Sequence, residues 1–360
     1  MRIEEYKSLA PLTTLGIGGP ARWFVRATTE EDIAAASVWA REHGHRVFVL
    51  GGGSNLLVSD AGFPGLVLHV ALRGISTGDT ARCRVYRAAA GEDWDALVER
   101  TVHDNCAGLE CLAGIPGTVG GTPVQNVGAY GQDVASVIDT VRAFDQQQRD
   151  YVHFTAAECA FAYRRSRFNS ADSGRYIVTR VDFQLTPGGS ATLRYADLQR
   201  AFSEGASPSL AEVAGAVRRI RHSKGMLIVE GDPDCRSAGS FFKNPLVNEE
   251  QLHFISTVAG AEPPQFPAGP EPEHAGKLKI PAAWLIEQSG FFRGYAKGAA
   301  GISSRHTLAI INRGGAVAAD VLALVGQIQA AVASRFQIHL EIEPVMVGFD
   351  HPTASSSAAG

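Results

Sequence analysis

The sequence predicts an α+β fold divided among several lobes, and two observations lead to this class. The 360 residues are 45% hydrophobic and only 19% charged, so the chain can bury a sizeable core and is long enough for two or three domains. Strand and helix patterns do not alternate regularly: a strand–helix–strand unit precedes a strand-rich region and then a region richer in helices. We expect lobes at residues 1–72, 73–224 and 225–337, a closing strand at about 338–349, and a disordered tail at 350–360.

The first lobe is predicted from a strand at 21–27, a helix, and a strand at 45–50. Thr28 or Thr29 begins the helix, because acidic residues follow in its first turn, and His43-Gly44 ends it. The second strand runs into the glycine-rich stretch LGGGSNLLVSD at 50–60, and a further strand at 65–72 follows with no helix between them. This order disfavours the dinucleotide-binding motif in which glycines open a helix. A nest of backbone N–H groups around a pyrophosphate, or a tight bend that binds nothing, both remain open.

The second lobe is predicted from strands at 83–91, 137–146 and 175–187 and from helices at 92–105 and 209–225. It contains a second glycine-rich stretch, AGIPGTVGGTPVQNVGAYGQDV at 113–134, which is too long for a hairpin turn. The third lobe is predicted from helices at 248–260, 280–290 and about 316–336, with a proline-rich loop at 261–276. In its last helix one apolar stripe at helical spacing predicts core packing: Val317, Val321, Leu324, Ile328 and Val332.

Composition favours a small-molecule partner over a macromolecular one. The net charge of −4 and the pI near 6.3 give no broad positive field, so we expect no nucleic-acid partner. No apolar run approaches the roughly 20 residues of a membrane helix, and the first residues lack a signal segment, so we expect a cytoplasmic protein without membrane insertion. The five cysteines have neither CxxC nor zinc-ligand spacing, which indicates reduced, mostly buried thiols and no metal.

Seven stretches resemble, in order, the UDP-N-acetylenolpyruvoylglucosamine reductase (MurB) family of peptidoglycan synthesis. They cover almost the whole chain: TLGIGGPA, LGGGSNLLVSD, AGIPGTVGGTPVQNVGAYGQDV, YRRSRF, GSFFKNP, AAWLIEQSGF and LEIEPVMVG. The resemblance implies a two-lobed FAD-binding domain of the vanillyl-alcohol-oxidase (PCMH) type plus a C-terminal α+β substrate-binding lobe, with the strand at about 338–349 returning to the first lobe. It also implies an enzyme that uses NADPH to reduce UDP-N-acetylglucosamine enolpyruvate to UDP-N-acetylmuramate through FAD, and we expect it to act as a monomer.

The resemblance places the FAD on the two glycine-rich loops. Glycines in such loops let the backbone approach a pyrophosphate where a Cβ would obstruct it. Neither loop contains a cysteine or histidine, so we expect a non-covalent cofactor. The cofactor-binding residues implied are Gly51, Gly52, Gly53, Ser54 and Asn55 in the first loop, and Gly114, Ile115, Pro116, Gly117, Thr118, Gly120, Gly121, Gln125, Asn126 and Gly128 in the second.

The same resemblance implies three catalytic residues. Hydride addition to an enolpyruvyl double bond leaves negative charge delocalised onto the adjacent carboxylate, and a guanidinium suits a carboxylate in two-point contact. The motif places this arginine at Arg164, the serine that protonates the second carbon at Ser240, and a glutamate that assists at Glu343. Glu341 is the alternative glutamate, because two residues separate the pair and both would share one face of a strand.

Substrate contacts are expected from five further residues, namely Tyr195, Lys224, Lys243, Asn244 and Gln288. Two other functions compete with the reductase. One is another FAD-dependent oxidase or dehydrogenase of the same fold, which would not need the arginine, serine and glutamate together. The other is a non-catalytic nucleotide-sugar-binding protein, which the intact glycine loops disfavour.

Overall fold

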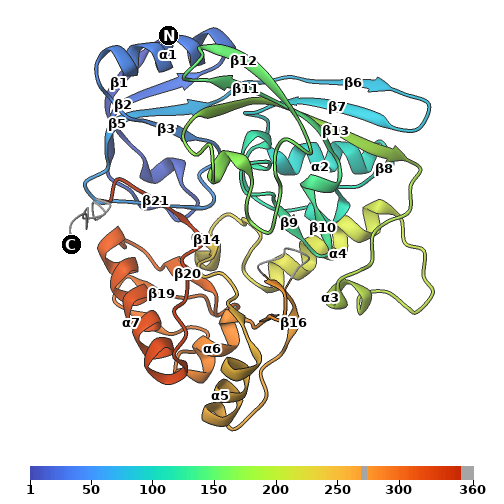
Figure 1. Ribbon diagram of the computed structural model, residues 1–360, viewed down its shortest axis with the longest axis vertical. Helices are drawn as coiled ribbons and strands as arrows, with labels where there is room; N and C mark the ends of the chain where they lie inside the picture. Colours follow the sequence, from blue (N-terminus) through green and yellow to red (C-terminus); the bar gives the residue numbers. More distant parts are fainter. Residues whose placement is uncertain (269–273, 350–360) are drawn as a thin grey trace, which may run out of the picture.

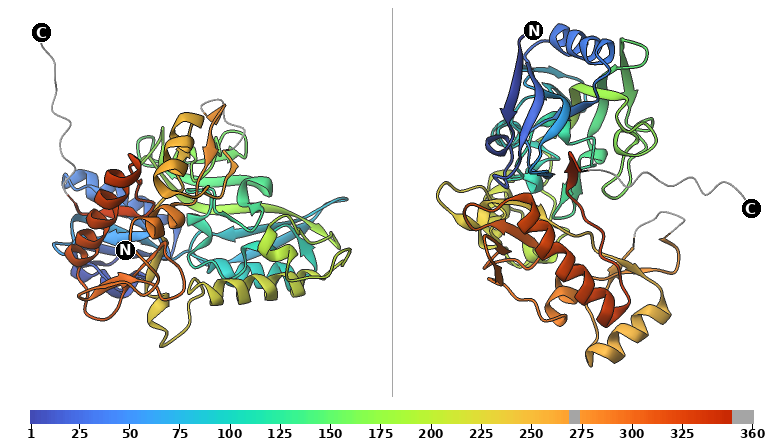
Figure 2. Two further views of the ribbon diagram at one scale, coloured as in Figure 1. Left: turned by 90° about the horizontal axis from the view of Figure 1, so that it is seen from below. Right: turned by 90° about the vertical axis from the view of Figure 1, so that its left-hand side faces the viewer.

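The computed structural model describes residues 1–268 and 274–349. The tail predicted at 350–360, and part of the proline-rich loop at 261–276, lie outside the described residues. Strands and helices are mixed as the sequence predicts, and the α+β class is confirmed. Two lobes built on sheets form one end of the molecule, and the C-terminal lobe forms the other (Figures 1 and 2). The boundaries at residues 72, 224 and 337 stay predictions.

The first lobe is a four-stranded sheet in the order β1-β2-β5-β3, crossed by one helix. The strands β2 and β3 both pair with β5 in parallel, and β1 is antiparallel to β2. Helix α1 begins after Thr29, whose side chain accepts the N–H of Asp32 while the Asp32 carboxylate accepts the N–H of Thr29, a capping box. The bounds are β1 (Ile3–Ser8), β2 (Pro20–Ala27), α1 (Glu30–Glu42), β3 (Val47–Leu50) and β5 (Phe63–Val70).

The second lobe is a larger sheet in the order β12-β11-β13-β7-β6, with β8 paired to the end of β13. Its helices α2 and α4 pack on each other, and one hydrophobic cluster spans this lobe and α1 of the first. The two lobes therefore share a core. The bounds are β6 (Ile75–Asp79), β7 (Arg84–Ala89), α2 (Trp94–His103), β8 (Cys106–Ala107), β9 (Gly128–Ala129), β10 (Gln132–Asp133), β11 (Ile138–Asp145), β12 (Asp150–Thr155), β13 (Tyr176–Pro187), α3 (Ala196–Gln199) and α4 (Leu210–Ser223).

The third lobe packs three helices on two small sheets, around a second hydrophobic cluster. Four members of the predicted apolar stripe in α7 are buried, but Val317 is 46% exposed. Its assignment to the core was wrong because it is the N-cap residue and precedes the first helical turn. The bounds are β14 (Ser237–Ser240), β15 (Leu246–Val247), α5 (Glu249–Ala259), β16 (Phe266–Pro267), β17 (Leu278–Lys279), α6 (Ala282–Gln288), β18 (Ala296–Lys297), β19 (Ala300–Ile302), β20 (Ala309–Asn312) and α7 (Ala318–Phe336).

After α7 the chain returns to the first lobe. Strand β21 (Val345–Val347) pairs in parallel with β4 (Leu56–Val58), which directly follows the first glycine loop. The strand is shorter than the 338–349 predicted, and it begins after Pro344, which has no N–H to donate to a ladder. Asp60 also joins the lobes, because its carboxylate accepts the N–H groups of Ala318 and Ala319 at the start of α7 (2.6 and 3.0 Å).

The structure also bears on the cysteines, on membrane-spanning helices and on metal ligands. All five cysteines are free thiols, four buried and Cys83 half-buried, which confirms that prediction. Across residues 1–268 and 274–349, no helix is both long and apolar enough to cross a membrane. Over those same residues, no three histidine, cysteine or acidic side chains are grouped so that they could hold a metal ion.

Candidate active site

The two predicted glycine loops lie in contact with each other. A Cβ built on Gly52 would stand 2.5 Å from Cα of Gly117, and one on Gly51 would stand 2.8 Å from Oγ1 of Thr118. Real Cβ atoms do not approach backbone so closely, so this joint between the loops requires glycine. Residues beside the joint line a common cavity: Ser54 and Asn55, which follow Gly52 and Gly53, and Ile115 and Pro116, which precede Gly117.

Arg164 enters this cavity from a tight turn. Residues 162–165 form the turn. The N–H of Ala162 donates to the carbonyl of Arg165, and the N–H of Arg165 donates to the carbonyl of Ala162. Arg164 has a φ of +55°, a left-handed conformation that costs a non-glycine residue roughly 1–2 kcal/mol. Asn126 donates to the carbonyl of Ala162 (3.1 Å), and Asn169 donates to that of Arg164 (3.1 Å). Neighbouring amides therefore hold the strained turn in place.

Ser240 and Glu343 reach the cavity through a short pairing between two distant segments. Phe242 and Ile342 form an antiparallel bridge, in which the N–H of Glu343 donates to the carbonyl of Phe241 (3.0 Å). Glu343 is tied to the first glycine loop as well, because Nδ2 of Asn55 donates to its carbonyl (3.4 Å). These backbone contacts place Ser240, at the end of β14, near Glu343 at the junction of the lobes.

The three predicted catalytic residues therefore line one cavity of about 170 Å³. Nε of Arg164 lies 2.9 Å from Oε1 of Glu343, an ion pair whose N–H is not aligned for a hydrogen bond. Nη1 of Arg164 donates to the carbonyl of Gly128 (3.0 Å). Because Glu343 makes this ion pair and Glu341 does not, the geometry favours Glu343 in the catalytic register.

A buried cation in the same cavity was missed by sequence reasoning. Arg221, on α4, is only 8% exposed, and its Nε donates to the carbonyl of Gly114 (2.9 Å) at the start of the second loop. Asp95 accepts the N–H of Gly114 (2.6 Å), so the N–H and the carbonyl of Gly114 are both held by side chains. Burial lowers the pKa of Arg221, with Tyr130 and Asp95 opposing the shift. Helix phase is the signal that could have found it, because Arg221 continues the buried stripe of Val213, Ala214 and Val217 at helical spacing.

The remaining predicted cofactor residues divide into two groups. Gln125 and Gly128 line the cavity. The others do not line it: Gly51, Gly52, Gly53, Gly114, Gly117, Thr118, Gly120, Gly121 and Asn126. Four of these form the joint, namely Gly51, Gly52, Gly117 and Thr118, and Gly121 is an exposed position where an added Cβ would meet no atom within 4 Å.

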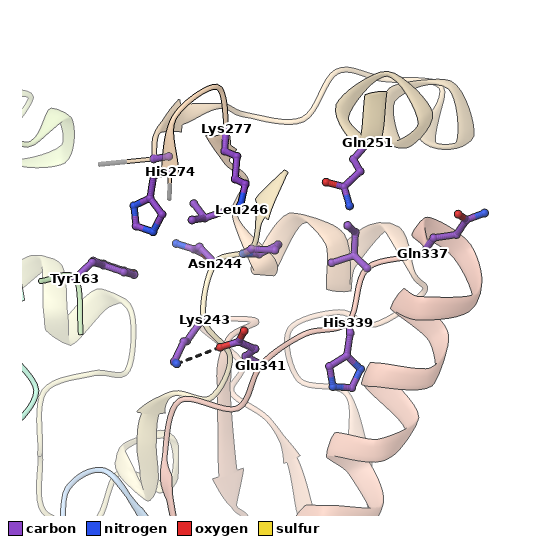
Figure 3. Close-up of a pocket in the computed structure, with 13 residues that line it drawn as sticks. Tyr163, Lys243, Asn244, Leu246, Gln251, His274, Lys277, Gln337, His339 and Glu341 are labelled. Atoms are coloured by element: carbon purple, nitrogen blue, oxygen red, sulfur yellow. Dashed lines mark hydrogen bonds and ion pairs between the residues drawn. The ribbon is translucent and has the colours of Figure 1, made fainter. Parts of the chain in front are cut away.

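A second cavity of about 480 Å³ lies beside the first, and Figure 3 shows its lining. Three segments line both cavities. Each supplies one residue to the larger cavity (Tyr163, Lys243 or Glu341) and a nearby one to the smaller (Arg164, Ser240 or Glu343). The larger cavity is rich in basic side chains, with Lys243, Lys277, His274 and His339 in its lining. Nζ of Lys243 lies 3.1 Å from Glu341, a carboxylate that is 67% exposed. The two glutamates thus face different cavities, contrary to the shared strand face that we expected.

The five predicted substrate residues are dispersed. Lys243 and Asn244 line the larger cavity, where Oδ1 of Asn244 also accepts the N–H of Ala282 (2.9 Å) at the start of α6. Tyr195, Lys224 and Gln288 are not among the described residues that line either cavity. Nζ of Lys224 lies 2.7 Å from Oδ2 of Asp197 and 5.9 Å from the centre of the Tyr195 ring. Burial by itself would lower the pKa of Lys224, but the contacts with Asp197 and the tyrosines outweigh burial, so the pKa is raised.

Comparison with known proteins gives this geometry its context. An FAD binding domain model matches residues 21–147, and the model of the UDP-N-acetylenolpyruvoylglucosamine reductase C-terminal domain matches residues 232–347. The chain is 46% identical over 350 residues to the UDP-N-acetylenolpyruvoylglucosamine reductase of Streptomyces coelicolor, covering 94% of this chain and 89% of that protein. The chain belongs to the UDP-N-acetylenolpyruvoylglucosamine reductase family.

Other members of the reductase family agree along the whole length. The Thermobifida fusca reductase is 45% identical over 346 residues, covering 94% of this chain and 96% of that protein. The crystal structure of the reductase (MurB) from Thermus caldophilus superposes with a TM-score of 0.66 at 27% identity, covering 96% and 99% of the two chains. This member of the family is therefore an FAD-dependent oxidoreductase, which confirms the predicted fold class, the FAD and the enzyme class.

The site fits the FAD that the family implies. The joint at Gly52 and Gly117 leaves no room for a Cβ, and the adjoining backbone and short side chains of Ser54 and Asn55 face the cavity. Backbone N–H groups and short polar side chains gathered in this way suit the phosphates of such a cofactor. Arg221 supplies a buried positive charge beside an anionic ligand, which would offset the cost of burying it.

Proposed function

We propose that this chain reduces UDP-N-acetylglucosamine enolpyruvate to UDP-N-acetylmuramate with NADPH as electron donor, in peptidoglycan biosynthesis. The observation that carries the proposal is the convergence of Arg164, Ser240 and Glu343 in one cavity beside the FAD-binding loops. A flavin oxidase acting on a simple alcohol has no need for a guanidinium and a hydroxyl placed together at the reacting carbon. The predicted cytoplasmic location and monomeric state remain predictions.

Arg164 is proposed to hold the substrate carboxylate. Its guanidinium is permanently charged and planar, so it can bind a carboxylate through two nitrogens and keep the carbon–carbon double bond in a fixed place. Negative charge grows on this carboxylate during reduction, and a preorganised donor at such a point is worth roughly 3 kcal/mol. Glu343 and the carbonyl of Gly128 fix the guanidinium from two sides, so little reorganisation is needed when the substrate binds.

Ser240 is proposed to donate the proton that completes the saturated lactyl group. Its hydroxyl is a weak acid, but an enolate carbon is a strong base, and the positive charge of Arg164 in the same cavity favours loss of the proton. Glu343 is proposed to assist, either as a donor when protonated or by orienting a water molecule. The FAD, held by the two glycine loops and Arg221, supplies the hydride-transfer chemistry.

The larger cavity is proposed to take the nucleotide of the substrate. Two phosphates carry negative charge, and this cavity has Lys243 and Lys277 on its walls, close to the catalytic cavity. Since Tyr163–Arg164, Ser240–Lys243 and Glu341–Glu343 each bridge the two cavities, a single extended substrate can occupy both. Tyr195 and Lys224 are proposed to contact the sugar or diphosphate from the second lobe.

An anaerobic experiment tests the proposal. The purified holoenzyme is bleached with NADPH, and UDP-N-acetylglucosamine enolpyruvate is then added while the flavin absorbance is followed. Return of the colour with formation of the saturated product is the expected result. Recovery only after oxygen is admitted would instead indicate an oxidase.

Ser240→Ala assigns the proton donor. We expect this variant to be bleached by NADPH at close to the wild-type rate but to form saturated product at least 10²-fold more slowly, the range that general acid catalysis commonly supplies. Ser256→Ala is the control, because within the described residues the Ser256 hydroxyl donates to the carbonyl of Leu252 in its own helix and to no other group. Equal damage to both half-reactions would contradict the assigned role.

A further inference from the structure

Glu110 is a fully buried carboxylate that lines neither cavity, and it is held by neutral donors. One oxygen accepts the N–H of Gly108 (2.8 Å), and the other accepts Nε2 of Gln132 (2.7 Å) and the N–H of Thr192 (2.9 Å). No basic side chain among the described residues forms an ion pair with it. A buried carboxylate that loses one of its hydrogen-bond donors is costly in free energy. These hydrogen bonds therefore hold the donor residues, and the segments they belong to, in place around Glu110.

Gln132 and Thr192 are also linked to each other and to the segment of Glu110. Oε1 of Gln132 accepts the N–H of Cys111 (2.8 Å), and Nε2 of Gln132 lies 3.2 Å from Oγ1 of Thr192. The Cys111 thiol donates to the carbonyl of Thr192 (3.2 Å), and burial raises its pKa to about 12, which keeps it a donor at neutral pH. Three segments are thus joined around one carboxylate.

One arm of this network leads to the catalytic arginine. Gln132 begins β10, which pairs with β9, and Gln132 lies opposite Ala129 in that pairing. The neighbouring residue in β9 is Gly128, whose carbonyl accepts Nη1 of Arg164 and which itself lines the catalytic cavity. A shift of Gln132 therefore moves an acceptor that orients Arg164.

The other arm leads to Tyr195. Thr192 is three residues before it, and the tip of the β9–β10 hairpin packs on the same stretch: a Cβ on Gly131 would stand 2.9 Å from Cβ of Arg194. The Tyr130 ring meets the Tyr195 ring edge-on at 5.3 Å. The β9–β10 hairpin and the segment that carries Tyr195 are thus packed on each other.

We propose that Glu110 is a positioning residue that sets both Arg164 and Tyr195 for the substrate, acting through Gln132 and Thr192. The inference rests on the function proposed above, since it assigns both residues to substrate. We expect substrate chemistry to suffer more than flavin reduction, because Gly114 and Gly117 of the second glycine loop are held from outside this network, by Asp95, Arg221 and the N–H of Trp94.

Exchange of the Glu110–Gln132 pair tests the proposal in the holoenzyme. Gln132→Glu puts two carboxylates together in a buried site, and we expect reoxidation by UDP-N-acetylglucosamine enolpyruvate to slow at least tenfold and the substrate KM to rise. Bleaching by NADPH should stay within threefold of wild type. Adding Glu110→Gln restores one donor and one acceptor to the pair, and it should recover a substantial part of the lost rate.

The same substitution in an Arg164→Met background shows whether the effect passes through Arg164. Gln132→Glu should then reduce the rate of reoxidation by a clearly smaller factor than in the wild-type background, because the Arg164 arm is gone and only the Tyr195 arm remains. A further reduction of the same size, equal damage to both half-reactions, or failure of Glu110→Gln to restore any rate would each overturn the proposal. If Gln132→Glu does not fold, Glu110→Gln alone is measured with the same readouts, and an unchanged rate and KM would overturn it.

Wild-type enzyme run in parallel separates the two proposals. If wild type is not reoxidised by the substrate, the proposed function fails and the positioning role fails with it. If wild type is reoxidised but the variants behave like it, only the positioning role fails.

Discussion

Gly52→Ala tests whether the contact between the two glycine loops is required for the FAD site. The new Cβ would stand 2.5 Å from Cα and 2.8 Å from the carbonyl carbon of Gly117, and neither backbone atom can yield as a flexible side chain would. Gly52 does not have a positive φ, so the effect is steric and not conformational. Inserting one carbon into packed structure costs about 1–3 kcal/mol. The loops must either bear this cost as strain or relieve it by separating.

These two responses have different signatures. Strain lowers the melting temperature of the apoprotein, whereas separation weakens FAD binding, by roughly 5- to 150-fold if the whole cost appears in the affinity. The assays are thermal denaturation of the apoprotein and a fluorescence titration with FAD. Gly121→Ala is the matched control: it lies in the second loop, has no positive φ, and would meet no atom within 4 Å. If Gly52→Ala and Gly121→Ala gave the same melting temperature and the same FAD affinity, the steric argument would be refuted.

The other predictions concern the glutamate register and pH. Glu343→Gln should slow reoxidation by the substrate at least 10²-fold, because it removes the ion-pair partner of Arg164. Glu341→Gln removes an exposed ion pair worth no more than about 1 kcal/mol and should change the rate less than fivefold. Stopped-flow flavin absorbance measures both rates, and a larger effect of Glu341→Gln would show that the assigned register is wrong. Burial lowers the pKa of His306 from 6.5 to about 4, with the charges of Lys224 and Arg293 acting in the same direction and Glu287 opposing. The folded state thus favours the neutral ring, so this contribution to stability is complete above pH 6.5 and is lost as pH falls toward 4, by up to about 3 kcal/mol at about 1.4 kcal/mol per pKa unit. Denaturant unfolding between pH 7 and 4 should show a smaller decline for His306→Gln than for wild type, and parallel declines would contradict the assignment.

The sequence determined the local elements that have strong chemical signals. The capping box at Thr29 and Asp32, the apolar stripe of α7 and the strands at 21–27, 137–146 and 175–187 could be predicted because each depends on neighbours within a few residues. Many of the other strands were not predicted, among them β1, β4, β6 and β12 and the short strands of the third lobe. Three of them, β1, β6 and β12, lie at sheet edges, and β4 has only three residues, so the apolar patterns are weak.

The ordered motifs also determined the family, the FAD and the three candidate catalytic residues, because those depend on residue types along the chain. The tertiary structure alone decided how they meet. Glu341 and Glu343 are equivalent by sequence, and the bridge between Phe242 and Ile342 turns one toward Lys243 and the other toward Arg164. Arg221 and Glu110 carry no distinctive motif, and their importance comes from burial and from partners more than 20 residues away. Such partners are chosen by packing between segments, which local sequence does not encode.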